Sequence, residues 1–353
     1  MATGTAAAAA GGYTDVCAMP NLKPVPDSAE SLQVEQEAIR RDACVRVHPY
    51  GAITRGERGE ALADLEAMAP FVPGFSDDGR GVQSESLMRQ AMELAGRLDR
   101  PIVAHCEEER LLAKGWSVHA GAYARRHGLV GNDPASEWRQ VERDLRLVRE
   151  TGCRYHVCHV SSRETVALVR AAKRDGLPVT CETGPHYLTL CDEALEDDGR
   201  FRMNPPIRSA ADRDALIEGL LDGTVDCVAT DHAPHSAEEK AGGLAKSLNG
   251  IVGLECAFPV LYTALVKSGK VPLEVLLNAM CVNPRRIFRF PGGRIAEGQP
   301  ADLTVLRLDR KHTVDPAEFR SRGRATPFEG WEVYGEIVMT VCNGEIVYRG
   351  EGV

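Results

Sequence analysis

The 353-residue sequence contains no run of eighteen apolar residues, so it predicts no membrane-spanning helix. It has no block of basic residues, and its net charge of -9 argues against nucleic acid as a partner. Aromatic residues make up only 5%, so Val, Ile, Leu and Ala must fill the core. The first residues lack the basic segment of a signal peptide, and we therefore expect a cytoplasmic protein.

Several catalytic signatures are also absent. No GxSxG motif occurs, which leaves serine-hydrolase chemistry unsupported, and no GxxxxGK[ST] loop occurs to hold a nucleotide phosphate. The 11 cysteines include no CxxC pair, and their number is odd. We interpret them as reduced and mostly buried thiols rather than a disulfide framework.

What the sequence does contain is an alternation of short apolar runs with helix-like segments. Asp27 or Ser28, and Ser161 or Ser162, stand where helices would begin, and the alanines at 6–10 predict the start of another helix. Such alternation predicts parallel strands joined by helical crossovers. The apolar runs lie at 14–20, 43–54, 71–78, 101–107, 154–161, 178–187 and 226–235.

Nearly every one of these seven runs ends in a polar residue. In a (β/α)₈ barrel the active site is built at the carboxyl ends of the strands, whereas a doubly wound sheet concentrates it at one switch point. We therefore predict a TIM-like α/β barrel over residues 1–290, one strand short of eight, and a small β module over 291–353. Asn343-Gly344 predicts a hairpin turn in that module. The strand-end residues are Asn21, His48, Asp78, His105, His159, His186 and Asp231.

Taken singly, each of these side chains has an ordinary structural explanation, since a lone histidine after a strand is usually a hydrogen-bonded core residue. Together, Asp78, His105, His159 and Asp231 would meet at the barrel mouth, and imidazole with carboxylate suits zinc. A metal lowers the pKa of bound water from about 15.7 to near 7, and Asp231 could exchange a proton with it. Of His156 and His159, we expect only His159 to face the interior.

The motifs then resemble the dihydroorotases of the long bacterial class, in the amidohydrolase superfamily. MPN and SDDG distinguish this resemblance from hydantoinases and allantoinases, which typically carry a carboxylated lysine where Asp78 stands. The resemblance covers essentially the whole chain. Its motifs are GGYTDVCAMPNLKPVPDS, FSDDGRGVQ, VAHCEE, YHVCHVSSRETV, TCETGPHYL, FRMNPPIRS, ATDHAPH, GIVGLE, NPRRIF, GQPADLTVL and TPFEGWEV.

The resemblance implies an activity and a role for each residue. The activity is the zinc-dependent, reversible cyclisation of N-carbamoyl-L-aspartate to dihydroorotate in pyrimidine synthesis. Asp78 would bridge two zinc ions, His105 and His159 would complete one site, and Asp231 would bind the other zinc and act as general base and acid. The substrate would be bound by Asn21, Asn204, His235 and the backbone of Asn249 and Gly250, although the family usually has an aromatic residue where Asn249 stands.

One family motif is missing, because the family's first barrel strand ends in HxH and no HxH occurs here. The second zinc site would keep only Asp78 and Asp231. We expect the natural protein to be longer at its amino end, and the activity of the 353 residues alone is left open. The alternatives are a hydantoinase or allantoinase relative, and a non-catalytic subunit that partners aspartate transcarbamoylase. Homodimer formation is also left open.

Overall fold

The computed structural model describes residues 1–350, and its centre is a curved ladder of parallel strands. Neighbouring strands follow the order β1, β2–β3, β4, β5, β8, β9 and β10. Tyr50 joins β2 to β3, since its N–H bonds to Ala18 while the N–H of Gly51 bonds to Gly74. The strands are β1 (Asp15–Ala18), β2 (Arg46–Pro49), β3 (Gly51–Ala52), β4 (Phe75–Ser76), β5 (Ile102–Ala104), β8 (Tyr155–Val157), β9 (Val179–Thr183) and β10 (Cys227–Val228).

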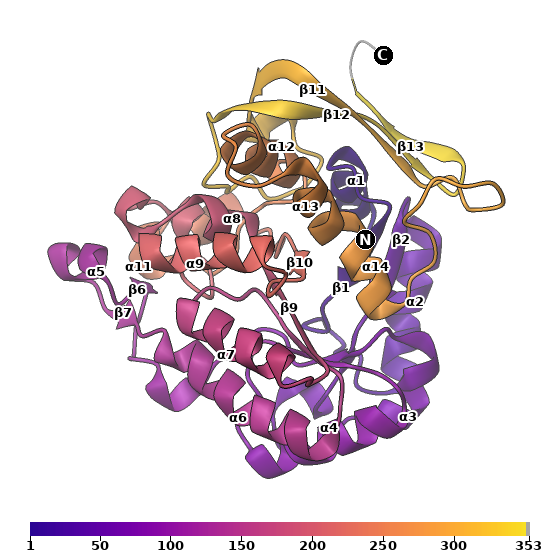
Figure 1. Cartoon of the computed structure of the whole chain (residues 1–353), viewed down its shortest axis with the longest axis vertical. Coiled ribbons are helices and arrows are strands. Elements are labelled where there is room, and N and C mark those ends of the chain that lie inside the picture. Colours follow the sequence, from indigo (N-terminus) through magenta and orange to yellow (C-terminus); the bar gives the residue numbers. More distant parts are fainter. Residues whose placement is uncertain (351–353) are drawn as a thin grey trace.

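This ladder confirms the predicted barrel architecture with one strand fewer than eight. Each of the seven apolar runs supplies one strand position, and β1 and β10 stand at the two ends of the ladder. Helices cover the outside, with α4, α6 and α7 side by side in Figure 1. The helices are α1 (Ala2–Ala10), α2 (Ala29–Asp42), α3 (Leu65–Met68), α4 (Glu85–Arg97), α5 (Ala122–His127), α6 (Ala135–Thr151), α7 (Arg163–Arg174), α8 (Pro185–Thr189), α9 (Ala210–Leu221), α10 (Ala237–Lys240), α11 (Gly243–Lys246), α12 (Ala257–Leu261), α13 (Leu273–Leu277) and α14 (Asn283–Phe288).

Serine caps begin several of the crossover helices, and Ser28 and Ser162 are the caps among the candidates that the sequence offers. The hydroxyl of Ser28 accepts from the N–H of Ser31 at the start of α2, and Ser162 accepts from Thr165 at the start of α7. Ser84 and Ser209 cap α4 and α9 in the same way. Each cap satisfies a backbone donor that the first helical turn leaves free, which fixes where the loop after a strand becomes a helix.

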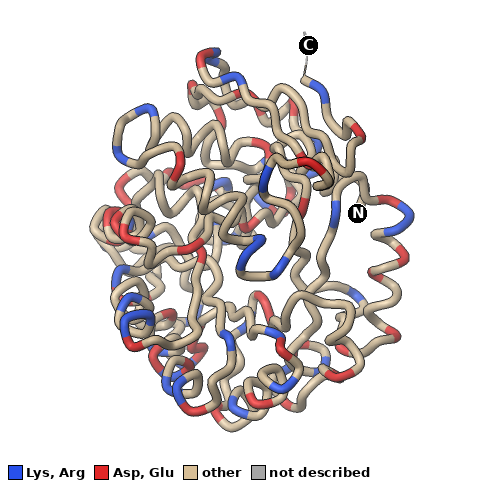
Figure 2. Tube along the Cα trace, turned by 45° about the vertical axis from the view of Figure 1, so that its right-hand side comes forward, with Lys and Arg blue, Asp and Glu red and all other residues tan. Residues whose placement is uncertain are grey.

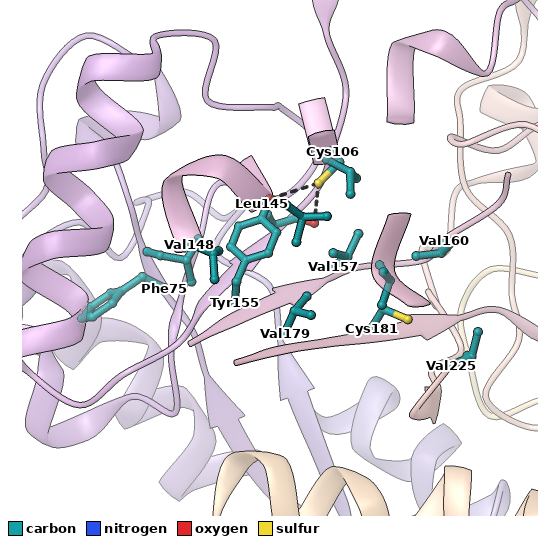
Figure 3. Close-up of a cluster of buried hydrophobic side chains, with 14 of the residues drawn as sticks. Phe75, Cys106, Leu145, Val148, Tyr155, Val157, Val160, Val179, Cys181 and Val225 are labelled. Carbon is teal, nitrogen blue, oxygen red and sulfur yellow. Dashed lines mark hydrogen bonds between the residues drawn. The ribbon is translucent and has the colours of Figure 1, made fainter. Parts of the chain in front are cut away.

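The main core lies between the outer face of the strands and these helices. Figure 3 shows Tyr155 and Val157 of β8 and Val179 of β9 with Leu145 and Val148 of α6. The buried Tyr155 hydroxyl donates to Asp144 at 2.7 Å and lies 3.3 Å from the Cys106 sulfur. Cys106 thus points away from the strand-end residues and into the outer core. All 11 cysteines are free, and most of them are buried.

On the inner face of β8, the structure differs from the expectation that only His159 faces the barrel interior. His156 is fully buried inside the barrel, where Nδ1 lies 2.7 Å from the Thr180 hydroxyl and Nε2 lies 3.2 Å from the Glu182 carboxylate. Its ring packs against Phe288, the last residue of α14. The strict alternation of a strand puts residue 156 inward, and His159 reaches the same interior because it lies beyond the strand in a left-handed backbone conformation.

A hollow of about 580 Å³ lies at the other, amino end of the strands. Its lining includes Arg100 and Arg154, which precede β5 and β8. Arg100 donates to the carbonyls of Ala69 and Val72, and Arg154 donates to that of Asp99. These guanidinium groups therefore hold loops together. His48 is the one predicted strand-end residue in the lining of the hollow, which Asp78, His105, His159 and Asp231 do not line.

The last part of the chain forms an antiparallel sheet of β11 (Leu303–Thr313), β12 (Glu332–Cys342) and β13 (Glu345–Arg349). It lies at the top of Figure 1, where β12 packs on α12 and both β12 and β13 contact α1. Asn343 and Gly344 have φ of 52° and 83°, as a type I′ hairpin turn requires, which confirms that prediction. A further pair of short parallel strands, β6 (Val118–His119) and β7 (Gly131–Asn132), flanks α5.

No helix in residues 1–350 is both long and apolar enough to cross a lipid bilayer. Acidic and basic positions are mixed along the outer helices (Figure 2). This distribution fits the absence of a basic block in the sequence.

Glu35 on α2 is an exception to the usual exposure of carboxylates. Its side chain is buried, and neither carboxylate oxygen has a hydrogen-bond partner. Burial raises its pKa from 4.5 to about 7. Because the folded-state pKa of Glu35 is raised, the contribution of this group to stability is fully present below pH 4.5 and is lost as the pH rises from 4.5 to 7.

We therefore expect Glu35→Gln to raise the free energy of unfolding by about 2 kcal/mol at pH 8, where the wild-type carboxylate is charged. The gain should be much smaller at pH 5. Thermal unfolding at both pH values measures the difference. Glu37→Gln, on the exposed face of the same helix, is the control, and a Glu35→Gln gain equal at both pH values would contradict the explanation.

Candidate metal centre

Three side chains from three different strand ends meet inside the carboxyl end of the barrel. Asp78 follows β4, His105 follows β5 and His159 follows β8, and one ligand atom from each lies within 4.8 Å of the others. Nδ1 of His105 is 2.9 Å from Nε2 of His159, which is 3.6 Å from Oδ1 of Asp78. We call these residues the three-residue group.

Asp78 is directed into the group because its neighbour Asp77 points the other way. Asp77 is buried, and its Oδ1 accepts from the backbone N–H groups of Ile53 and Thr54 at 2.8 and 3.0 Å. Its other oxygen bonds to the Thr54 hydroxyl. Asp77 thus fixes the strand end to the preceding loop, and the next side chain faces the barrel interior.

His105 is positioned by Gln140 on α6. The side-chain amide of Gln140 donates to the His105 carbonyl at 3.4 Å, and its oxygen accepts from the N–H of Glu107 at 3.1 Å. Both the strand end and the start of the next loop are therefore pinned to one helix. Glu137, one turn earlier on α6, does the same for the loop after β8 by accepting from the N–H groups of Ser161 and Ser162.

His159 and Asp231 share an unusual backbone conformation. Their φ angles are 34° and 47°, in the left-handed region that residues with a Cβ rarely adopt. Such conformations cost of order 1–3 kcal/mol each and cluster at functional sites. Here they turn both side chains inward just after β8 and β10 end.

The charges of the site act strongly on one another. Burial opposes ionisation of His159, but Asp78 and Asp231 raise its pKa to about 9. Burial would also raise the pKa of Asp78, yet the two imidazoles hold it below its usual value. Burial dominates at Asp231 and raises its pKa to about 6, even though His159 favours the charged form. Asp231 interacts electrostatically with all three residues of the group, although it is not one of its members.

Two of the amide side chains predicted to bind substrate border the three-residue group. The Asn21 amide donates to Oδ2 of Asp78 at 3.1 Å. The Asn204 amide donates to the carboxylate of Glu107 at 3.2 Å, and that carboxylate lies 3.6 Å from Nε2 of His105. Sequence reasoning missed Glu107, although its position two residues after His105 in an extended segment predicts the same facing direction.

The remaining predicted residues form a second cluster after β10. Nε2 of His235 lies 2.8 Å from the Asn249 carbonyl, and the Asn249 side chain accepts from Arg202 at 2.7 Å. Gly250 has φ of 134°, and a Cβ there would come within 2.6 Å of the Ala233 carbonyl, so only glycine fits without strain. No hydrogen bond within residues 1–350 joins this cluster to the three-residue group.

His232, between Asp231 and this cluster, is a structural residue. Its Nδ1 accepts from the backbone N–H groups of Gly253 and Leu254, and Nε2 faces Ser321. Burial lowers its pKa to about 4, so it stays neutral at physiological pH. The TDHAPH segment thus directs its acid to the three-residue group and its two histidines to the surrounding loops.

Comparison with known proteins identifies the family. The chain is 50% identical over 349 residues to a dihydroorotase of Bacillus caldolyticus, a match that covers 98% of this chain and 82% of the relative. The chain belongs to the dihydroorotase family. A dihydroorotase of Halalkalibacterium halodurans is 48% identical over 351 residues, covering 98% of this chain and 81% of the relative. A family model described as dihydro-orotase-like matches residues 1–165.

Solved structures place the fold in the same group of enzymes. An L-hydantoinase (dihydropyrimidinase) from Arthrobacter aurescens superposes with a TM-score of 0.86 at 27% identity, covering 100% of this chain and 81% of that chain. A dihydropyrimidinase from Brevibacillus agri gives a TM-score of 0.84 at 22% identity over 99% of this chain and 79% of its own, which supports the fold alone. The dihydroorotase-family chain is thus an enzyme of the cyclic amide hydrolase class.

The three-residue group suits a divalent metal ion. Two imidazole nitrogens and one carboxylate form a common zinc donor set, and all three residues are largely buried. Nδ1 of His105 and Nε2 of His159 converge at 2.9 Å, so at least one of them must carry a proton when no cation lies between them. The donor chemistry therefore fits the metal dependence of the amidohydrolases.

Proposed function

We propose that this chain catalyses the reversible cyclisation of N-carbamoyl-L-aspartate to (S)-dihydroorotate and water, in pyrimidine biosynthesis. The observation that carries the proposal is the three-residue group at the carboxyl ends of β4, β5 and β8, in a chain half identical to named dihydroorotases. Asp78 also supports it over a hydantoinase, because that group of enzymes typically has a carboxylated lysine there.

Zinc is the metal we propose, held by Asp78, His105 and His159. When bound, it supplies a water of lowered pKa and polarises the amide carbonyl. Asp231 accepts a proton from the attacking water and returns it to the ring nitrogen as the amide bond breaks. In the direction of ring closure, Asp231 takes the proton from the carbamoyl nitrogen and delivers it to the departing water.

The substrate contacts we propose are Asn21 and Asn204 on one side, and His235 with the backbone of Asn249 and Gly250 on the other. The amide groups of Asn21 and Asn204 are already near the three-residue group, where they could donate to a substrate carboxylate. Hydrogen bonds to Arg202 and Lys240 hold the loop of Asn249 and Gly250, which favours a preformed binding surface.

The family's second metal site would retain only Asp78 and Asp231 within these 353 residues, since no HxH is present. We therefore propose one tightly held zinc per chain. The same departure supports a second candidate, a non-catalytic dihydroorotase-like subunit that partners aspartate transcarbamoylase. A cytoplasmic location and a homodimer are further proposals.

The decisive experiment is a substrate panel on the purified chain with added zinc. We expect dihydroorotate to be hydrolysed with a kcat/KM at least 100-fold above that for hydantoin, dihydrouracil or allantoin, because the proposed contacts of Asn21 and Asn204 would favour a substrate carboxylate. Preference for hydantoin or allantoin would contradict the assignment. Bound zinc without turnover, together with co-purification of aspartate transcarbamoylase, would favour the non-catalytic subunit.

A further inference from the structure

Glu107 places a carboxylate beside the three-residue group, but it has no role in the proposed reaction. Its side chain is buried next to the three-residue group, and the pair of glutamates that follows it points elsewhere, with Glu109 exposed. The backbone around Glu107 is fixed on two sides, because its N–H donates to Gln140 and its carbonyl accepts from Gln83 at 2.9 Å. A buried carboxylate is costly unless its charge is paired, so a partner for the Glu107 side chain is expected nearby.

The partner is the second ring nitrogen of His105. Nδ1 of His105 is turned toward His159, whereas Nε2 is buried and has no hydrogen-bond partner. The carboxylate oxygen of Glu107 lies 3.6 Å from Nε2, slightly longer than a hydrogen bond. The same oxygen accepts from the Asn204 amide at 3.2 Å.

A neutral imidazole has one lone pair and one N–H group. If Nδ1 of His105 offers its lone pair to a metal, the proton must reside on Nε2, where it faces Glu107. A carboxylate at that position fixes the tautomer and the ring orientation and makes the ligating nitrogen more basic. Asn204 bonds to the same oxygen, so the contact also joins the metal ligand to a residue proposed to bind substrate.

We propose that Glu107 is a positioning residue that holds His105 in its metal-binding tautomer and couples this ligand to Asn204. The proposal deepens the proposed function and rests on its metal centre. Glu107 contacts neither metal nor reacting atoms. It acts through His105, so its loss weakens zinc binding even when the fold is intact.

The test is the zinc affinity of Glu107→Gln, measured by competition with a coloured chelator. Glutamine has nearly the same shape but lacks the charge, and we expect the dissociation constant to rise by about 10–100-fold. The cobalt-substituted protein reports the ligand field directly, and its visible bands should shift in the variant. Glu109→Gln removes an exposed carboxylate two residues away and should change neither measurement.

The metal centre and the role of Glu107 are tested separately. Wild-type protein that binds no zinc would refute the metal centre, whereas equal zinc affinity of wild type and Glu107→Gln would overturn only the role of Glu107. Should Glu107→Gln fail to fold, Glu107→Asp decides, because it keeps the charge but withdraws it by one methylene. Weakened zinc binding in Glu107→Asp supports the proposal, and unchanged binding overturns it.

Discussion

Replacing Asp231 by asparagine is expected to lower kcat for dihydroorotate hydrolysis by about 10³-fold or more, while KM changes little. Positioned general acid–base groups contribute typically 10²–10⁴-fold, and in the proposed mechanism one carboxylate both accepts and returns the proton. Burial raises the pKa of Asp231 to about 6, which brings it nearer to neutrality than an ordinary aspartate. Asparagine is nearly isosteric but cannot accept the proton. Steady-state kinetics of both proteins with saturating zinc measures the loss.

The zinc content of the variant distinguishes loss of proton transfer by Asp231 from loss of the metal site. Asp231 lies outside the three-residue group, so Asp231→Asn should retain its zinc at that site. Asp214→Asn on the exposed face of α9 makes the same chemical change, and its kinetics should match the wild type. Activity of Asp231→Asn within a factor of ten of wild type would refute the proton-transfer role. Loss of both zinc and activity would instead make Asp231 a ligand of the retained ion.

The sequence predicts the strand positions well because local rules determine them. Each apolar run ends at a polar residue where the strand gives way to a loop. Serine caps such as Ser28 and Ser162 begin the following helices. Parallel strands bring their carboxyl ends to one rim, so residues as distant as Asp78 and His159 could be predicted to converge without any knowledge of their contacts. The structure places their atoms 3.6 Å apart.

The details that the sequence does not determine depend on single backbone angles and on distant contacts. Alternation assigned only one of His156 and His159 to the interior, but the left-handed conformation at His159 brings both inside. The separate directions of Asp77 and Asp78 depend on the loop at Thr54, which lies far away in sequence. The pairing of Glu107 with Asn204 spans 97 residues, and no periodicity within one segment could predict it.

His159→Ala is expected to abolish tight zinc binding at the three-residue group. The imidazole of His159 is the one side chain with a contact to both other members, at 2.9 Å to His105 and 3.6 Å to Asp78. Its removal leaves two donors, too few for a zinc site that needs three protein ligands. A ligand present at 100 times its dissociation constant stabilises a protein by about 2.7 kcal/mol, so zinc should raise the melting temperature of the wild type but not of the variant. Differential scanning calorimetry with and without zinc measures this difference.

The comparison must distinguish a lost ligand from a damaged fold. His127→Ala removes an imidazole from the exposed end of α5, and its response to zinc should equal that of the wild type. The zinc-free melting temperature of His159→Ala should fall, because the substitution removes the contacts of Nε2 to His105 and Asp78 and leaves a cavity, so the deciding measurement is the zinc-dependent rise within each protein. A zinc-dependent rise in His159→Ala as large as in the wild type would show that the metal binds elsewhere, and the assignment of Asp78, His105 and His159 as its ligands would then be wrong.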